Sequence, residues 1–124
     1  MKKLCTKWFI KWASKANLSN QNLLESIDDL EKGLSIADLG GNIFKLRVKR
    51  PGKGKSAGFR TIVIYKKKDK AIFLYGFGKN EKSNISKTEL QYFKKMGNDL
   101  LVLNSKQLTG SIEKQILFNL EVSE

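Results

Sequence analysis

The first third of the chain shows the helical spacing of apolar side chains. One stripe consists of Trp8, Phe9, Trp12, Ala13 and Ala16, and a second consists of Leu23, Ile27 and Leu30. Apolar residues three and four positions apart indicate helices with one buried face. Ser19 suits the N-cap of the second helix, and Gly33 suits the position just after its end. We therefore expect two helices in an antiparallel hairpin, with both tryptophans as core anchors.

The middle of the chain changes to the two-residue alternation of β-strands. In residues 43–49 apolar and basic side chains alternate, which predicts one buried face and one ladder of cations. Residues 59–66 and 71–77 are rich in the β-branched and aromatic residues that favour strands. The loop SIADLGGN precedes these strands, the glycine-rich PGKGKSAG separates the first two, and KKKDK turns the chain into the third. This order predicts an antiparallel meander.

The last third returns to helical spacing. Ser86 and Glu89 form an S-x-x-E capping box, which marks the start of a third helix. Its inward residues are expected to be Leu90, Phe93, Gly97 and Leu100 or Leu101. Beyond Ser105 we expect a short helix to about residue 115 and an extended tail, LFNLEV, that adds an edge strand. A chain of 124 residues is expected to form a single domain over residues 1–124, of the α+β class.

Positive charge is concentrated in the middle of the chain. The formal net charge is +12, and 13 of the 24 basic residues but two of the 12 acidic residues lie between Lys45 and Lys82. Charge gathered on one set of strands indicates a face that meets a polyanion, whereas scattered charge indicates a solvated surface. Around the turn KKKDK, long-range electrostatic steering alone is expected of Lys66, Lys67, Lys68 and Lys70.

The residue types of this segment restrict its chemistry. Histidine is absent and carboxylates are scarce among the cations, so we expect no metal site, no cofactor and no metal-dependent nuclease. RNA cleavage without metal stays open, because RNA carries its own nucleophile in the 2′-hydroxyl. Arginine binds phosphate oxygens with a planar fork. A lysine crowded by other cations can transfer a proton, because like charges disfavour its charged form, and Lys53 and Lys55 lie close to Arg50 and Arg60 in sequence.

Other features favour structural roles. Tyr75 and Phe77 could stack on nucleobases, but an aromatic stripe in a strand more often belongs to the core. Cys5 is the single cysteine, so it is expected to be a small apolar filler in a protein of the reducing cytoplasm. No apolar run approaches the length of a membrane span, and Lys7 and Lys11 interrupt the start before a signal peptide could form.

Two segments resemble a known family. The run LGGNIFKLRVKRPGKGKSAGFRTIVIY and the following FLYGFGKNEKSNISKTEL resemble the RelE/ParE superfamily of bacterial type II toxins. Its RelE/HigB-like branch carries GKSGGFR-type and YGFxKNExxNI-type segments. The resemblance implies an N-terminal helical hairpin packed on a curved antiparallel sheet with a C-terminal helix. It also implies a ribosome-dependent mRNA endonuclease that needs no metal, inhibits translation, and is neutralised by an antitoxin, expected to be of the helix-turn-helix type.

The resemblance also implies roles for individual residues. Arg60 falls at the family's phosphate-binding arginine, and it is predicted to act in catalysis with Lys53, Lys55 and Lys79. The residues predicted to bind RNA around them are Arg47, Lys49, Arg50, Asn80 and Lys82. The chain departs from the best-studied RelE enzymes at two positions, because Asn80 stands where they have an arginine and Ser86 stands near their tyrosine. Lys79 and Lys82 are the cations that could compensate.

Two other functions stay open at this point. The ParE-like branch shares the fold but inhibits DNA gyrase, and the dense lysines around the glycine-rich loop favour the nuclease over it. The segment AGFRTIVIY weakly matches an RNA-binding strand motif, so a non-catalytic RNA-binding protein is the third possibility.

Overall fold

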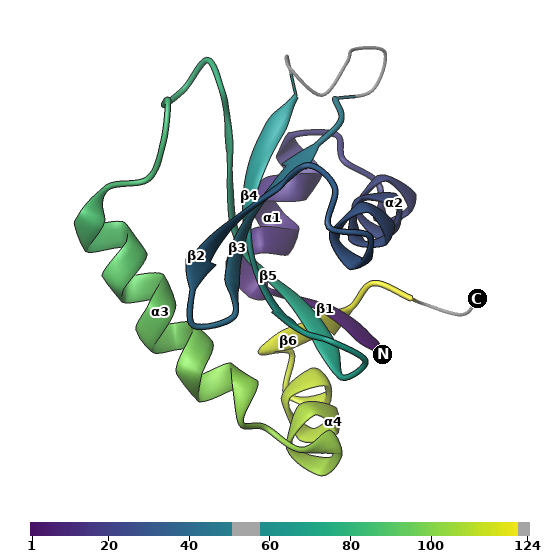
Figure 1. Cartoon of the computed structure of the whole chain (residues 1–124). Helices are drawn as coiled ribbons and strands as arrows, with labels where there is room; N and C mark the ends of the chain where they lie inside the picture. Colours follow the sequence, from purple (N-terminus) through teal and green to yellow (C-terminus); the bar gives the residue numbers. More distant parts are fainter. Residues whose placement is uncertain (51–57, 122–124) are drawn as a thin grey trace.

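A sheet with helices on both faces is the framework of the fold (Figure 1). The computed structural model describes residues 1–50 and 58–121. The elements in this part of the chain are, in order, β1 (Lys2–Thr6), α1 (Lys7–Lys15), α2 (Asn20–Glu31), β2 (Ile36–Gly40), β3 (Ile43–Val48), β4 (Phe59–Lys66), β5 (Lys70–Gly78), α3 (Lys87–Leu101), α4 (Ser105–Glu113) and β6 (Leu117–Asn119). This order gives the predicted α+β class.

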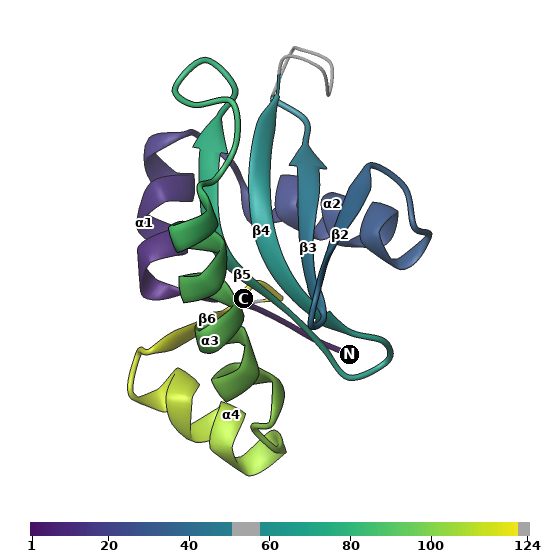
Figure 2. The same ribbon diagram turned by 60° about the vertical axis from the view of Figure 1, so that its left-hand side comes forward.

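In the described chain the sheet has six strands in the order β2-β3-β4-β5-β1-β6. The predicted antiparallel meander is confirmed, because β4 pairs antiparallel with both β3 and β5. The predicted edge strand near the C-terminus is also confirmed, as β6, which lies antiparallel to β1. A bulge between Ile62 and Val63 interrupts the β4–β5 register, and Figure 2 shows these two strands curving along their length.

Two strands differ from the prediction. β1 was not expected, and it lies parallel to β5, so the sheet is mixed rather than wholly antiparallel. Its neighbouring residues Leu4 and Cys5 are both buried, and a strand covered on both faces shows no alternation of apolar and polar residues. β2 lies in the segment that was predicted to be a loop. Its five residues are all exposed or half-buried, so they carry no apolar pattern either.

The helices form a layer on each face of the sheet. On one face, Phe9 of α1 and Leu23 and Ile27 of α2 pack with Leu46 and Val48 of β3 in one buried cluster. On the other face, α3 and α4 contribute Phe93 and Leu108 to a second cluster, whose sheet residues include Ile43, Ile62, Ile64 and Ile72. Figure 2 shows α3 in front of the sheet and α2 behind it. The expectation that the two N-terminal helices pack on the sheet is therefore confirmed.

The prediction that both tryptophans anchor the core is wrong for Trp8. Its side chain is 48% exposed, and its ring stacks on Tyr75 with 4.6 Å between the ring centroids. Trp12 is half-buried and lies flat against β5, where a Cβ at Gly76 would come within 2.3 Å of its ring. The difference follows from position. β1 ends at Thr6 and pairs with β5 only as far as Phe73, so within the described residues the rest of β5 has no strand on that side. Trp8, at the start of α1, lies over this unpaired part of β5 at Tyr75.

Lys70 also differs from its prediction as a steering charge. It is fully buried, and its ammonium donates hydrogen bonds to the carbonyl oxygens of Leu100, Leu101 and Leu103, at 3.3, 2.8 and 2.6 Å. The last carbonyls of a helix have no partners within the helix and attract cations. Lys70 therefore ties the end of α3 to the start of β5, and it is a structural residue.

Several local predictions are confirmed. Ser19 caps α2, and Ser86 and Glu89 form the capping box of α3. Gly33 follows the end of α2 with a φ of +72°. Cys5 is a buried thiol, and burial raises its pKa to about 12, so it is an unreactive filler. Across the ranges 1–50 and 58–121, no helix is both long and apolar enough to span a membrane.

Candidate functional site

Three neighbouring strands place two of the predicted residues side by side. Arg47 of β3 lies opposite Arg60 of β4, and Arg60 lies opposite Phe77 of β5. Residues directly opposite each other in a sheet point to the same face. Ile62, two residues along from Arg60, packs in the cluster beneath α3, so Arg60 and Phe77 lie on the α3 face of the sheet, while the Arg47 side chain also borders α2.

The two arginines of this row form a paired positive charge. Arg47 is exposed and Arg60 is half-buried. The pKa of Arg60 is lowered from its ordinary value, mainly by burial and then by the positive charge of Arg47, yet a guanidinium stays protonated at neutral pH. Like charges opposite each other on adjacent strands repel, and an anion held between them relieves that repulsion. The pair is therefore suited to bind a phosphate through its non-bridging oxygens.

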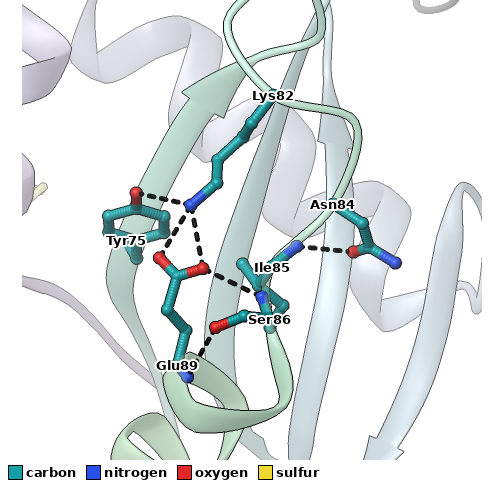
Figure 3. A network of polar contacts seen from close by, with 6 residues as sticks. All are labelled: Tyr75, Lys82, Asn84, Ile85, Ser86 and Glu89. Carbon is teal, nitrogen blue, oxygen red and sulfur yellow. Dashed lines mark hydrogen bonds and ion pairs between the residues drawn. The ribbon is translucent and has the colours of Figure 1, made fainter.

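A polar network lies beside this row (Figure 3). The Lys82 ammonium donates to both carboxylate oxygens of Glu89, at 2.9 and 2.7 Å, and to the hydroxyl of Tyr75 at 3.4 Å. It also lies 5.4 Å from the centroid of the Tyr75 ring and 5.8 Å from that of Phe77. Because Phe77 is the strand neighbour of Arg60, this network continues the positive row toward α3.

The network keeps its charges at neutral pH. The hydrogen bond from Lys82 is the main reason why the pKa of Glu89 is lowered, and the same bond raises the pKa of Lys82. Both groups therefore stay ionised between the acidic and the strongly basic ranges. Glu89 and Tyr75 were not predicted as site residues. The sequence did mark Glu89 as the capping-box residue of α3. Its contact with Lys82 depends on the path of residues 79–86 between β5 and α3, which the capping box does not predict.

Arg50 and Asn80 lie on the opposite face from Arg60. The Arg50 guanidinium carbon lies 4.7 Å from the centroid of the Phe59 ring, which belongs to the cluster beneath α1 and α2. A Cβ at Gly78 would come within 2.7 Å of Asn80 Oδ1 and 3.7 Å of Arg50 Nη2, so these side chains gather over the same glycine. The groove there measures about 600 Å³, and it also borders Trp12, Lys15 and Glu81. These two predicted residues are thus not brought together with the arginine pair.

Of the remaining predicted residues, one shares a groove with Arg47, one follows β5, and two are not described. Lys49 is exposed and borders a groove of about 260 Å³ that it shares with Arg47 and with Glu25 and Asp29 of α2. Lys79 is exposed immediately after β5. The predicted catalytic residues Lys53 and Lys55 lie outside the described residues. In the parts of the chain that the structure covers, no group of three or more histidine, cysteine or acidic side chains is placed to hold a metal ion.

The fold and the site define a small α+β protein with a cationic sheet face, and comparison with known families gives its membership. The family model described as the RelE toxin of the RelE/RelB toxin-antitoxin system matches residues 1–120. The chain therefore belongs to the RelE toxin family. No match was found to a curated protein or to a solved structure.

Proposed function

We propose that this toxin is a metal-independent, ribosome-dependent endoribonuclease that cuts mRNA and so inhibits translation. The observation that carries the proposal is the cross-strand pair of Arg47 and Arg60 beside Lys82. Two arginines on adjacent strands, with Lys82 beside them from the loop after β5, support a fixed place for one phosphate and its neighbours. The family's membership in toxin-antitoxin systems supports the same conclusion.

The proposed reaction uses the RNA's own 2′-oxygen as nucleophile. That oxygen forms a bond to phosphorus, the bond to the 5′-oxygen breaks, and a cyclic phosphate remains. The 2′-hydroxyl gives its proton to a base, and the departing 5′-oxygen receives a proton from an acid. Negative charge grows on the non-bridging oxygens in the transition state, and Arg60 and Arg47 are placed to stabilise it.

The other residues have supporting roles in this proposal. Lys53, Lys55 and Lys79 are the proposed proton carriers, and Lys49 and Lys82 would bind neighbouring phosphates. Arg50 and Asn80 face the other side of the sheet, so we assign them no part in the cleavage step. The proposed partners are the ribosome with its mRNA and a cognate antitoxin of the helix-turn-helix type. Because translated mRNA is the substrate, the proposed location is the cytoplasm, and the proposed unit is a single domain of residues 1–124.

The test is controlled expression in bacterial cells, with the 5′ ends of translated messages mapped after induction. Growth arrest with new ends inside coding regions is expected for the wild type, and Arg60→Ala should abolish both. Lys67→Ala, which removes an exposed charge in the turn after β4, at the other end of that strand from Arg60, is the matched control and should behave as the wild type. Arrest with intact messages would overturn the proposal, and DNA breaks during that arrest would select gyrase inhibition instead.

A further inference from the structure

An aromatic groove lies between α1 and α3 beside β5. It measures about 530 Å³ and is lined mainly by Trp8, Leu74, Tyr75, Tyr92, Phe93 and Met96. Two of these residues are unusually exposed for large aromatic side chains, with Trp8 at 48% and Tyr92 at 61%. Exposed apolar surface gathered in one groove, unlike single exposed residues, indicates a binding site.

The rings of this groove form a chain of contacts that runs from α1 over β5 to α3. Trp8 stacks on Tyr75 at 4.6 Å between centroids, and Tyr75 lies 5.0 Å from Phe93. Phe93 in turn meets the edge of Tyr92 at 5.6 Å. The buried Phe93 and the half-buried Tyr75 thus support two exposed rings, one from each helix. Because these contacts hold the rings in place, a flat ligand would find aromatic surface that needs little ordering.

The groove is continuous with the positive row. Tyr75 borders the groove and also accepts the hydrogen bond from Lys82. Lys82 lies over both Tyr75 and Phe77, and Phe77 is the strand neighbour of Arg60. Tyr75 and Phe77 are two residues apart on one strand, which is a separation of about 7 Å. An RNA strand with a phosphate at Arg60 could therefore place a base of a nearby nucleotide in the groove.

We propose that this groove binds a nucleobase of single-stranded RNA, which stacks on Tyr92 and Trp8. The inference rests on the proposed function for the position of the phosphate. A polyanion is the occupant that complements Arg60 and Arg47, which lie beyond the Lys82–Glu89 ion pair, and the net charge of +12, and every base offers a flat face to the rings. The base would be the element that fixes the strand's register on the arginine pair.

Glu89 adds a preference among the bases. Its Oε1 accepts hydrogen bonds from Lys82 and from the backbone N–H of Ser86, whereas Oε2 accepts the bond from Lys82. A carboxylate has about four acceptor sites. One site on Oε2 therefore remains for an N–H donor at the rim of the groove, which Glu89 also lines. Adenine, cytosine and guanine carry an exocyclic amino group that can donate there, whereas uracil offers only its ring N3–H.

The experiment compares the binding of short oligonucleotides that cannot be cut. A 2′-O-methyl oligoadenylate and an abasic oligonucleotide of the same length and charge are titrated into the full chain. The wild type should bind the base-bearing strand about tenfold more tightly. Tyr92→Ala should remove most of that difference, and Tyr92→Phe, which keeps the ring, should retain it. Val102→Ala, at a 77% exposed apolar residue that does not line the groove, is the matched control and should also retain it.

The outcomes separate this inference from the proposed nuclease. A full tenfold difference in folded Tyr92→Ala would overturn the stacking site. Strands of purine riboside, which lacks the amino group, should bind about threefold more weakly than oligoadenylate. Equal affinity would overturn the role of Glu89. Because no step needs cleavage, the discrimination between strands stands or falls independently of whether messages are cut in cells.

Discussion

Both ends of the β4–β5 hairpin carry cations, but they use them differently. At the open end, Arg60 lies beside Arg47, and Lys82 follows from the loop after β5. At the turn end, Lys66, Lys67 and Lys68 are exposed, and Lys70 is buried under the end of α3. β4 has eight residues, so the ends are roughly 25 Å apart, which exceeds the screening length of about 8 Å at physiological salt.

The difference shows that charge density along a sequence is not the same as a charged face. The 13 basic residues between Lys45 and Lys82 would form one patch if the segment were a single surface. The topology instead sends them to two ends of a hairpin and to both faces of the sheet, where Arg50 lies apart from Arg60. What separates a binding site from solvated charge is therefore the strand register.

The largest contrast between the ends is expected in catalysis. Arg60→Ala removes the cation that we propose stabilises the growing phosphate charge, and cleavage should fall at least about 100-fold, which corresponds to about 3 kcal/mol. Single-turnover cleavage of mRNA on purified ribosomes measures this directly. Lys67→Ala at the turn end should stay within about twofold of the wild type. Comparable losses in both variants would remove the distinction between the ends.

The second contrast concerns stability, and here the turn end should dominate. Lys70→Met keeps the apolar stem but leaves three carbonyl oxygens of the α3 terminus without this donor. The free energy of unfolding should fall by about 3 kcal/mol. Urea denaturation measures the change, and Lys67→Met should stay within about 0.5 kcal/mol of the wild type. An unchanged midpoint for Lys70→Met would show that the buried ammonium contributes nothing to the end of α3.

Much of the fold could be predicted because its elements have one buried face. The α1, α2 and α3 helices and the strands β3 to β5 show clear three-to-four or two-residue spacing. β1 could not be predicted, because Leu4 and Cys5 are buried on opposite faces, and β2 could not, because none of its residues is buried. These two strands are identified by their pairing with β5 and β3, and the spacing of apolar residues within a strand does not show which strand it pairs with.

The candidate site was predicted in part for the same reason. The alternation in β3 places Arg47 on the face away from Leu46 and Val48. Continued by two residues, the same alternation places Arg50 on the face of Val48, so the sequence does indicate that Arg50 and Arg47 lie on different faces. Glu89 and Tyr75 join Lys82 through the path of residues 79–86, which no periodicity describes. The exposure of Trp8 likewise follows from where β1 ends.

The smallest expected effect concerns the ion pair at the open end. The pKa of Glu89 is lowered in the folded state, so its contribution to stability is present above the ordinary value of 4.5 and is lost as the pH falls through the lower folded value. Glu89→Gln should therefore be less stable than the wild type at pH 7, by a fraction of the Lys70→Met loss. Urea midpoints of the two proteins should converge as the pH falls below 4.5.

The matching effect for Lys82 has the opposite sign. Its pKa is raised above the ordinary value of 10.5, so its contribution is present below that value and is lost as the pH rises through the folded value. Between these ranges the difference between wild type and Glu89→Gln should be flat. A midpoint difference that changes between pH 6 and 9 would show that another group controls the network.

The most direct test of the difference between the two ends is the salt dependence of RNA binding. The double variants Arg47→Gln with Arg60→Gln and Lys67→Gln with Lys68→Gln remove equal charge from the open end and the turn end. The ligand is a 2′-O-methyl RNA strand, and the slope is that of log affinity against log salt concentration. We predict that the Arg47→Gln, Arg60→Gln variant has a slope less steep by about 1.4, and that the Lys67→Gln, Lys68→Gln variant has the slope of the wild type. Equal losses from both pairs, or none from the first, would contradict a phosphate-binding site at Arg47 and Arg60.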